Sequence, residues 1–500
     1  MNGNINDPAK SIATFHAGQS IFLTGATGFL GKVYIEKILR SCPDVREIFL
    51  LLRSKNGQSV NERLDKILSL PLYDKLREEQ PSNFKKLIPI SGDVSKENLD
   101  LSAVDRQTLA ERVTIVIHSA ASVRFNDSLK YAIFTNTRST RDICILAQSM
   151  KNLIVLVYVS TAYAHINNPV IKEKVYPPVA DWRKMIKAAE SLDEHILNIF
   201  TAKCLDNFPN TYIFSKNLAE GVITEYSSSL PCAIVRPSIV TPSLSDPFPG
   251  WIDNLNGLTG LLIGGGKGVL RVFQTNKHVC PNVMPVDIVI KSVIDAAWKI
   301  GLTTFTPGSP PFVLNCTSSN QRNMSLEAVS KMGFQIIKDE IPLEGALWTP
   351  GTIFTNSFAV HYILTILLHI LPAMLIDLIL KLTRHQPILV RLQRKVYVAN
   401  RAVGHFVSHQ WTFEDKNSLD LMSLVPPEDR EIFSCDATDV DIKDYYRKSI
   451  IGTKMYLLHE DMNRLDAARA HRKRVDLFVT TLKTVIVIGV LWMIYKWICT

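Results

Sequence analysis

The feature that most constrains the fold is the stretch 20–32, which reads S-I-F-L-T-G-A-T-G-F-L-G-K. Its first part, 21–23, is a short apolar run typical of a strand buried in a parallel sheet. Gly25, Gly28 and Gly31 follow at a spacing of three, and a segment with apolar residues at helical spacing continues to Leu39. A strand, a glycine-rich turn and a helix in this order predict a dinucleotide-binding unit, in which the helix N-terminus faces the pyrophosphate.

The second expected strand bears on the form of the dinucleotide. Residues 47–53 read E-I-F-L-L-L-R, so this strand ends in Arg53, and Lys55 follows closely. Enzymes that use NAD typically place a carboxylate here to bind the ribose 2′-hydroxyl, whereas cations accommodate a 2′-phosphate. We therefore predict NADPH rather than NADH. The alternative is that both cations simply face solvent.

Apolar runs at 86–90, 113–118, 153–160 and 232–236 predict four more strands, with helical segments between most of them. This alternation predicts a doubly wound parallel sheet, which binds ligands at the carboxyl ends of its strands. Asp93 follows the third strand and is expected to accept a hydrogen bond from the adenine amino group, although a simple turn aspartate fits the local sequence equally well. The residues expected to contact the cofactor are Thr24, Gly25, Thr27, Gly28, Phe29, Leu30, Gly31, Arg53, Lys55, Asp93, Val94, Ala120, Tyr212, Lys216 and Pro237.

Acid–base chemistry is expected from Tyr212 and Lys216, which lie four residues apart and so share one face of the predicted helix 209–226. A phenol ordinarily loses its proton at about pH 10. A neighbouring ammonium and a positively charged nicotinamide would lower the pKa of the phenol, so that Tyr212 can protonate an oxygen while hydride reaches the adjacent carbon. A hydroxyl at the end of the strand 153–160, from Thr161 or Ser160, would hold that oxygen.

The composition indicates a globular, cytosolic body with a membrane anchor. Of the 500 residues 46% are hydrophobic and 21% charged, the formal net charge is +9, and the eight cysteines stand singly. The stretch 477–498 is long and apolar enough to cross a bilayer, and the basic run R-A-H-R-K-R at 469–474 precedes it. A membrane is therefore the expected partner, rather than nucleic acid. A buried C-terminal helix is the alternative.

Several motifs resemble those of fatty acyl-CoA reductases, which belong to the extended short-chain dehydrogenases/reductases. They are T-G-A-T-G-F-L-G-K, V-S-T-A-Y, P-N-T-Y-I-F-S-K-N-L-A-E, I-V-R-P-S-I-V and P-G-W-I-D-N, in the family's order and over nearly the whole chain. The resemblance implies that Tyr212 and Lys216 are the catalytic pair and that Thr161, rather than Ser160, is their hydroxyl partner.

The resemblance also implies that a long-chain acyl-CoA is reduced to a primary alcohol with two NADPH. The first hydride would give a hemithioacetal that loses CoA to leave an aldehyde, and the second would reduce this aldehyde. Another membrane-bound enzyme of the same fold, such as a hydroxysteroid dehydrogenase or an epimerase, and a catalytically silent NADP-binding scaffold are the alternatives. Two departures from the family pattern, Ser215 in place of threonine and Arg138-Ser139 in place of a residue–glycine pair, affect helix packing at most.

Three further stretches carry weaker signals. The apolar stretch 358–382 is compatible with a membrane-dipping hairpin, a wall of an acyl-chain tunnel or ordinary helical core. The stretch 264–268, G-G-G-K-G, lacks the Ser or Thr of a P-loop, so it is expected to be a flexible loop or to contact an anionic substrate group. His405 and His409 have the spacing of a metal pair on a helix, but no third ligand accompanies them, so no metal site is predicted.

These features together predict an α/β fold with three parts. A doubly wound parallel-sheet Rossmann domain is expected over 1–340, a helical C-terminal domain over 341–468, and a basic flank with a transmembrane helix over 469–500. The endoplasmic reticulum is expected to hold the anchor, rather than the peroxisome.

Overall fold

The computed structural model describes residues 11–55, 57–318 and 324–499. The chain forms two compact units, and each unit takes three separate segments of the sequence. Unit 1 comprises Met1–Phe248, Asn282–Arg322 and Trp411–Asp439. Unit 2 comprises Pro249–Pro281, Asn323–Gln410 and Val440–Thr500.

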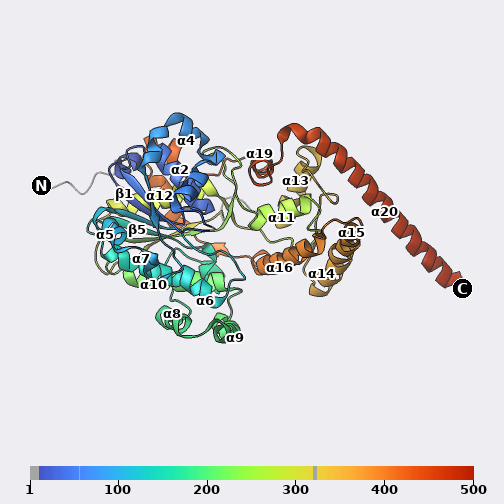
Figure 1. The fold of residues 1–500 in the computed structure, drawn as a ribbon, viewed down its shortest axis with the longest axis horizontal. Helices are drawn as coiled ribbons and strands as arrows, with labels where there is room; N and C mark the ends of the chain where they lie inside the picture. The colour runs from blue at the N-terminus through green and yellow to red at the C-terminus, as the bar shows by residue number, and fades with distance from the viewer. Residues whose placement is uncertain (1–10, 56, 319–323, 500) are drawn as a thin grey trace. The chain divides into compact units, whose positions relative to one another are not determined.

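Unit 1 is built on a seven-stranded sheet in which every neighbouring pair of strands is parallel (Figure 1). The strands lie in the order β11-β7-β5-β4-β1-β2-β3. Their bounds are β1 Ser20–Thr24, β2 Glu47–Leu52, β3 Leu87–Ser91, β4 Ile115–His118, β5 Val155–Val159, β7 Cys232–Pro237 and β11 Phe312–Cys316. Because the strand order reverses between β1 and β4, the carboxyl ends of these two strands border the crevice in which such folds bind ligands.

The six predicted strands are all present, and the doubly wound α/β fold is confirmed. Strands β1, β2, β4, β5 and β7 are buried at every residue. Helices cover both faces of such a sheet, so its strands are continuous apolar runs rather than alternating patterns. The sequence analysis did not find β11, whose run F-V-L-N-C is interrupted by the buried Asn315.

Helices α2 (Phe29–Ser41) and α12 (Val286–Leu302) pack together, as do α7 (Ser139–Gln148) and α10 (Thr211–Tyr226). The two pairs lie on opposite sides of the sheet (Figure 1). Helix α10 begins close to the predicted position, because the side chain of Asn210 accepts a hydrogen bond from the backbone N–H of Ile213. This start places Tyr212 in the first turn and Lys216 one turn later.

Shorter elements complete unit 1. Strand β6 (Val170–Ile171) pairs with β13 (Thr412–Phe413), and β8 (Ile239–Thr241) pairs with β10 (Val283–Pro285). The remaining α-helices are α1 Ile12–His16, α3 Val60–Leu68, α4 Asp74–Glu79, α5 Ala103–Arg112, α6 Leu129–Ala132, α8 Trp182–Ser191, α9 Glu194–Leu205, α17 Lys416–Leu424 and α18 Arg430–Phe433.

Unit 2 is mainly helical, and its strands β9 (Val272–Gln274) and β12 (Ile353–Thr355) form a small parallel pair. Its α-helices are α11 Gly257–Gly266, α13 Leu326–Asp339, α14 Phe358–Thr365, α15 Leu371–Leu382, α16 Leu389–Ser408, α19 Ile442–Gly452 and α20 Leu465–Cys499. The prediction of a flexible loop at 264–268 is wrong in part, because residues 264–266 form the last turn of α11. A side chain at Gly265 would collide with Phe334, and one at Gly266 with Ile337, so these glycines allow α11 to pack on α13.

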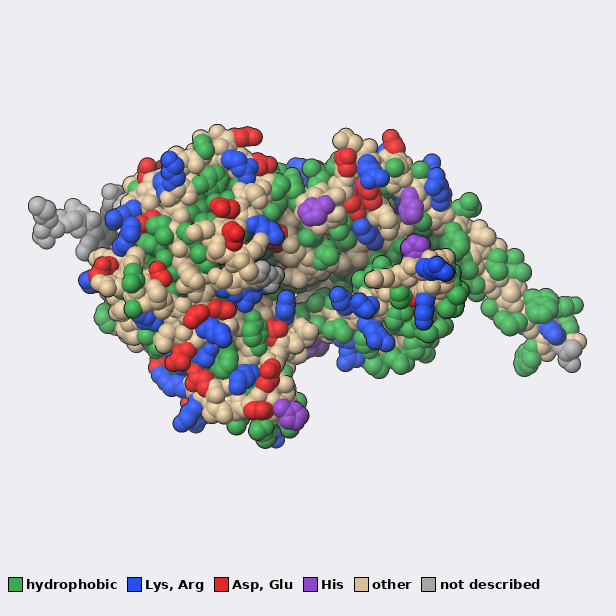
Figure 2. Space-filling view, in the orientation of Figure 1, with side chains coloured by type: hydrophobic (Ala, Val, Ile, Leu, Met, Phe, Trp, Pro, Cys, Tyr) green, Lys and Arg blue, Asp and Glu red, His purple; other side chains and the backbone are tan. Residues whose placement is uncertain are grey.

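Two helical segments of unit 2, Phe358–Leu382 and Met462–Cys499, are long and apolar enough to cross a membrane, by length and composition. In the segment Met462–Cys499, only 6% of the most apolar 18-residue stretch is buried in the protein. The alternative of a buried C-terminal helix is therefore wrong. Figure 2 shows hydrophobic side chains along this helix. The most apolar 18-residue stretch of Phe358–Leu382 is 22% buried, so this segment is not an ordinary core helix.

Candidate active site

The glycine-rich turn brings the backbone of β1 close to that of β4. Gly25 has φ +83°, which L side chains rarely adopt, and a Cβ there would lie 2.8 Å from the backbone nitrogen of Ala120. A Cβ at Gly31 would overlap the carbonyl oxygen of Gly25. Gly28 precedes α2 and supplies no side-chain capping bond, so the amides of the first turn are left for an external acceptor. This cradle fits the pyrophosphate of a dinucleotide.

A buried histidine joins the ends of the two central strands. Thr24 Oγ1 lies 2.7 Å from His118 Nδ1 and accepts a hydrogen bond of 3.2 Å from the backbone N–H of Ala120. Burial lowers the pKa of His118 to about 3, and the charge of Lys216 acts in the same direction, so the ring is neutral at physiological pH. The sequence analysis did not single out His118, although it is the last residue of a predicted strand.

The two residues predicted to bind the adenosine end lie together. Arg53 Nη1 is 3.8 Å from Asp93 Oδ2, at the carboxyl ends of β2 and β3. The other carboxylate oxygen of Asp93 accepts hydrogen bonds of 2.8 Å from the backbone N–H and the hydroxyl of Ser95, so Asp93 also stabilises its own turn. Both roles that the sequence left open are therefore compatible with its position.

Thr161, Tyr212 and Lys216 come together at the end of β5. The hydroxyl of Thr161 acts to lower the pKa of the Tyr212 phenol, so the two side chains are close neighbours. Lys216 is buried, and its Nζ donates a 2.6 Å hydrogen bond to the carbonyl oxygen of Val159. Ser160 Oγ instead donates to Glu220 Oε1 at 2.5 Å, so its hydroxyl is engaged away from Tyr212. This arrangement favours Thr161 as the hydroxyl partner.

Burial changes the pKa values of this pair in opposite directions. It raises the pKa of Tyr212 to about 12, although the neighbouring hydroxyl of Thr161 acts the other way. It lowers the pKa of Lys216 to about 7, and the charge of Glu220 opposes this change. In this chain the ammonium of Lys216 is directed at the carbonyl of Val159 and the ring of Tyr158, and the lowering of the Tyr212 pKa by Lys216 together with a positively charged nicotinamide stays a prediction.

A buried ionic network lies directly behind these residues, and the sequence analysis missed it. Glu220 accepts hydrogen bonds from Arg236 Nε at 2.9 Å and Nη2 at 2.6 Å, and its Oε2 is 2.7 Å from His165 Nε2. Burial would raise the pKa of Glu220, but the charges of Arg236 and His165 outweigh it and hold this pKa below its ordinary range. The available signals were a glutamate four residues after Lys216 and an arginine ending an apolar strand.

Contacts through Tyr158 connect the glycine-rich turn to the predicted catalytic residues. Its ring centroid is 5.5 Å from that of His118, which bonds Thr24, and 4.4 Å from Lys216 Nζ. The hydroxyl, phenol and ammonium groups therefore adjoin the cradle for a dinucleotide, at the switch point of the sheet.

Comparisons with known proteins identify the family. Two family models, both described as "Male sterility protein", match residues 23–293 and 368–460. Fatty acyl-CoA reductase 1 of Xenopus laevis is 38% identical over 485 residues, which are 97% of this chain and 93% of the relative, and the human protein of that name gives the same values. The chain belongs to the fatty acyl-CoA reductase family.

The fold of this reductase also resembles solved reductase domains. The terminal R domain from the myxalamid PKS-NRPS biosynthetic pathway has a TM-score of 0.56 and 18% identity, and the match covers 91% of this chain and 95% of that domain. The reductase domain of a nonribosomal peptide synthetase from Mycobacterium tuberculosis has a TM-score of 0.57 and 16% identity, with 89% and 96% covered. These structures support the fold, and the family model that matches residues 23–293 assigns a nicotinamide cofactor to this reductase.

Some predicted cofactor residues lie apart from the contacts described above. Lys55 is exposed and forms an isolated bridge with Gln58, and Thr27 is exposed in the turn. Val94 is half-buried beside Asp93, and Pro237 ends β7 directly after Arg236. Their contacts with a cofactor remain predictions, as do the roles of the other site residues.

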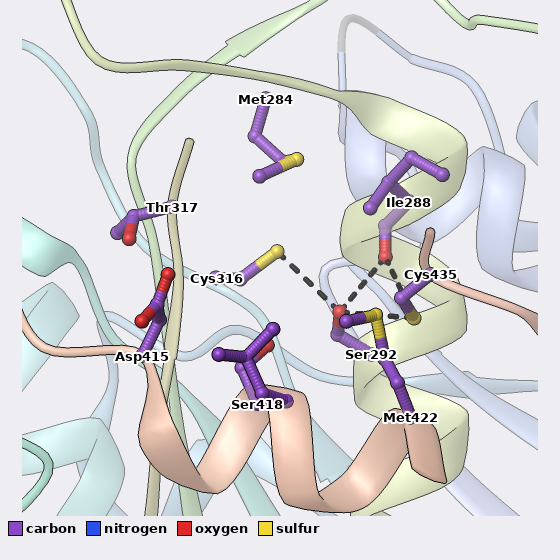
Figure 3. Close-up of a pocket in the computed structure, with 10 residues that line it drawn as sticks. Met284, Ile288, Ser292, Cys316, Thr317, Asp415, Ser418, Met422 and Cys435 are labelled. Carbon is purple, nitrogen blue, oxygen red and sulfur yellow. Dashed lines mark hydrogen bonds between the residues drawn. The ribbon is translucent and has the colours of Figure 1, made fainter. Parts of the chain in front are cut away.

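A small cavity in unit 1 is distinct from this site. Figure 3 shows Ser292 of α12 between Cys316 and Cys435, with its Oγ 3.4 Å from each sulfur. Residues of α12, α17 and β11 line the cavity, and the predicted site residues do not.

The two histidines considered as a metal pair contact each other. His405 and His409 have stacked rings with centroids 4.5 Å apart. Among the residues that the structure describes, His, Cys, Asp and Glu side chains nowhere gather in threes that could hold a metal ion.

Proposed function

We propose that this reductase converts a long-chain fatty acyl-CoA into CoA and a primary fatty alcohol, through an aldehyde and with two NADPH. The observation that carries the proposal is the position of Tyr212 one helical turn before Lys216, whose ammonium donates to the carbonyl oxygen of Val159 at the end of β5, two residues before Thr161. A phenol and a hydroxyl that meet beside a dinucleotide cradle suit the reduction of a carbonyl group. The names of the relatives supply the acyl-CoA substrate.

When bound, one NADPH would supply a hydride to the thioester carbonyl carbon, and a second NADPH would supply one to the aldehyde carbon. Tyr212 donates its proton to the carbonyl oxygen, and Thr161 orients that oxygen. In the hemithioacetal the phenolate of Tyr212 takes the hydroxyl proton back, the carbon–sulfur bond breaks, and CoA leaves as a thiolate that solvent protonates. Tyr212 then donates again, to the oxygen of the aldehyde, and its phenolate takes a proton from solvent before the next turnover. Because its pKa is raised to about 12, Tyr212 is protonated at neutral pH, which is the form a proton donor requires.

The choice of NADPH over NADH is supported by Arg53. It extends from the end of β2 with 45% of its side chain exposed, and its only ion pair among the described residues is the long contact with Asp93. Its guanidinium is therefore available to a 2′-phosphate, with Lys55 nearby in the sequence.

The anchor is proposed to be α20. Its apolar part follows the basic run 469–474, which suits the cytosolic side of a bilayer and keeps the catalytic unit in the cytosol. The endoplasmic reticulum is the proposed membrane. Co-localisation of the tagged full-length chain with endoplasmic reticulum markers tests this location, and co-localisation with peroxisomal markers would contradict it.

Product analysis tests the reaction. The full-length protein in detergent micelles is given palmitoyl-CoA and NADPH, and consumed NADPH, free thiol and lipid products are measured together. We expect one free thiol and one fatty alcohol for every two NADPH, with aldehyde only as a transient. A panel of acyl-CoAs then defines the chain length.

Other outcomes would point to the alternatives. Turnover of a sterol or a sugar nucleotide instead of acyl-CoA would indicate a different enzyme of this fold. Binding of NADPH without any turnover would indicate a silent scaffold. Either result contradicts the proposed function.

A further inference from the structure

The helical segment 358–382 of unit 2 separates its side chains by chemistry. It consists of α14, a π-helical turn at Ile366–Ile370 and α15. One stripe of side chains recurs at every fourth residue and is turned into the protein. It comprises His361, Thr365, His369, Ala373 and Asp377, of which the first four are buried and the last is half-buried.

The polar members of this stripe have partners inside unit 2. His369 Nε2 accepts hydrogen bonds from the backbone N–H groups of Arg271 at 2.9 Å and Val272 at 3.1 Å. His361 Nε2 lies 3.2 Å from Asn400 Nδ2 of α16. These polar groups do not face lipid, and a helix crossing the bilayer would have to break their contacts or carry unit 2 with it.

Asp377 is the one carboxylate of the segment, and it caps α16. Its Oδ1 accepts hydrogen bonds from the N–H groups of Ile388 at 3.0 Å and Leu389 at 2.9 Å, and its Oδ2 accepts one from Val390 at 2.9 Å. Its charge is thus directed at the positive end of α16 and away from the outer surface.

The outer side of the segment, which we call the apolar face, is composed almost entirely of large hydrophobic side chains. They extend over the full length of the segment, and the exposed fraction reaches 76% at Leu382. The residues of the apolar face are Phe358, Val360, Tyr362, Ile363, Ile366, Leu367, Leu371, Met374, Leu375, Ile376, Leu378, Ile379 and Leu382. An exposed apolar surface of this extent marks an interaction site.

Positive charge lies beside the apolar face. The sequence contains no Asp or Glu between Asp377 and Glu414. It contains the exposed cations Lys381, Arg384, Arg391, Arg394, Lys395 and Arg401, and within the described part of the chain no carboxylate forms an ion pair with any of them. Figure 2 shows Lys and Arg side chains next to hydrophobic ones in the region of α14 and α16.

We propose that the segment 358–382 lies flat in the headgroup region of an anionic lipid leaflet. The apolar face enters the boundary between headgroups and acyl chains, and the cations beside it bind the anionic headgroups. Hydrophobic exposure alone would also suit a protein partner, but the one-sided positive charge beside it complements a lipid surface. This contact is separate from the α20 anchor, which would only keep unit 2 near the bilayer.

Depth-dependent photolabelling tests the proposal on the full-length protein in vesicles. One set of vesicles is phosphatidylcholine alone, and in the other about a third of the lipid is phosphatidylserine, because anionic lipid is the expected partner. A phospholipid carries a diazirine either near the headgroup or at the end of its acyl chain. Labelled peptides are identified by mass spectrometry, and the α20 peptide serves as the internal standard.

We expect the shallow probe to label 358–382, the deep probe to label α20 but not 358–382, and phosphatidylserine to raise the shallow labelling by roughly threefold or more. The triple variant Arg391→Glu/Arg394→Glu/Lys395→Glu should lose this rise. The matched variant Lys184→Glu/Lys187→Glu/Lys203→Glu changes exposed lysines of α8 and α9 and should keep it.

Three outcomes would overturn the proposal. Deep labelling of 358–382 would make it a membrane span, and no labelling above that of the exposed helix α9 would exclude lipid. If 358–382 is shielded from photolabelling in detergent without vesicles, and the protein is a dimer there, the apolar face is covered by a second copy of the chain. Loss of α20 labelling alone would contradict the anchor and leave this proposal standing.

Discussion

Tyr212 carries the proposed chemistry most directly. In Tyr212→Phe the proton donor is missing while the ring that packs against Phe125, with centroids 5.8 Å apart, is kept. We expect kcat for alcohol formation to fall by about 10²- to 10⁴-fold, with an unchanged melting temperature. Tyr131→Phe, at an exposed tyrosine of α6, is the control and should keep full activity. A Tyr212→Phe protein that keeps most of its turnover would contradict the role.

Lys216 predicts a pH dependence. Its pKa is lowered to about 7, so the ammonium is present below that pH and is lost as the pH rises through it. If the charged form serves catalysis, kcat/KM should decline above about pH 7, since this parameter follows the ionisation of the free enzyme. Lys216→Arg stays charged throughout, and the decline should vanish even if the overall rate is lower. Identical profiles for both proteins would rule out this role.

Arg53 is expected to decide between the two cofactors. Arg53→Asp replaces the cation with the carboxylate that favours a ribose 2′-hydroxyl. We expect KM for NADPH to rise by roughly tenfold or more and KM for NADH to fall, since a charge-assisted contact to the phosphate is lost. Lys66→Asp in α3 makes the same charge change and should leave both constants near their original values. An unchanged preference in Arg53→Asp would refute the assignment.

At the scale of elements, Glu220 holds together the parts that carry the site. It lies on α10 and bonds Ser160 after β5, Arg236 of β7 and His165. In Glu220→Gln the fully buried guanidinium of Arg236 loses its carboxylate, so we expect a loss of about 3–5 kcal/mol in the free energy of unfolding.

Chemical denaturation measures this loss. Glu225→Gln on the same helix breaks an exposed ion pair with Arg183 and should cost at most about 1 kcal/mol. Equal effects of the two substitutions would mean that burial does not strengthen the Glu220 network.

The elements that sequence reasoning found are those fixed by local patterns. The six predicted strands are apolar runs, and the start of α10 is marked by an asparagine cap. Strand β11 was missed because Asn315 breaks its apolar run. In the structure the side-chain amide of Asn315 donates to the carbonyl oxygens of Ile171 and Glu414, which are far away in the sequence. Such polar pairing depends on tertiary contacts that one sequence does not display.

The same limit applies to the site. The glycine turn and the Tyr212–Lys216 spacing are local signals, and both were found. His118 has its partner on another strand and Arg236 has its partner on helix α10, so neither role was visible in the sequence. The pKa of Tyr212 depends on burial, which the sequence does not display either.

On the scale of the whole molecule, the third segment of unit 1 predicts where the chain can be shortened. Within Trp411–Asp439, Asn417 Nδ2 donates to the carbonyl oxygen of Val313 at 2.8 Å, and Phe413 and Phe433 are buried. A chain ending at Gln410 exposes the surfaces that these residues cover and should show no cooperative thermal unfolding. A chain ending at Arg474 keeps this segment, loses the apolar part of α20, and should melt normally and leave the membrane fraction.

Unit 1 is assembled from three segments that are separated in the sequence by parts of unit 2. Its pieces are therefore not synthesised one directly after another. Strand β11 and helix α12 follow the first stretch of unit 2, and the segment ending at Asp439 follows the second. A ribosome therefore releases the complete nucleotide-binding sheet long before the last piece that packs against its edge. The nascent enzyme must keep that edge from wrong partners until residues 411–439 have emerged.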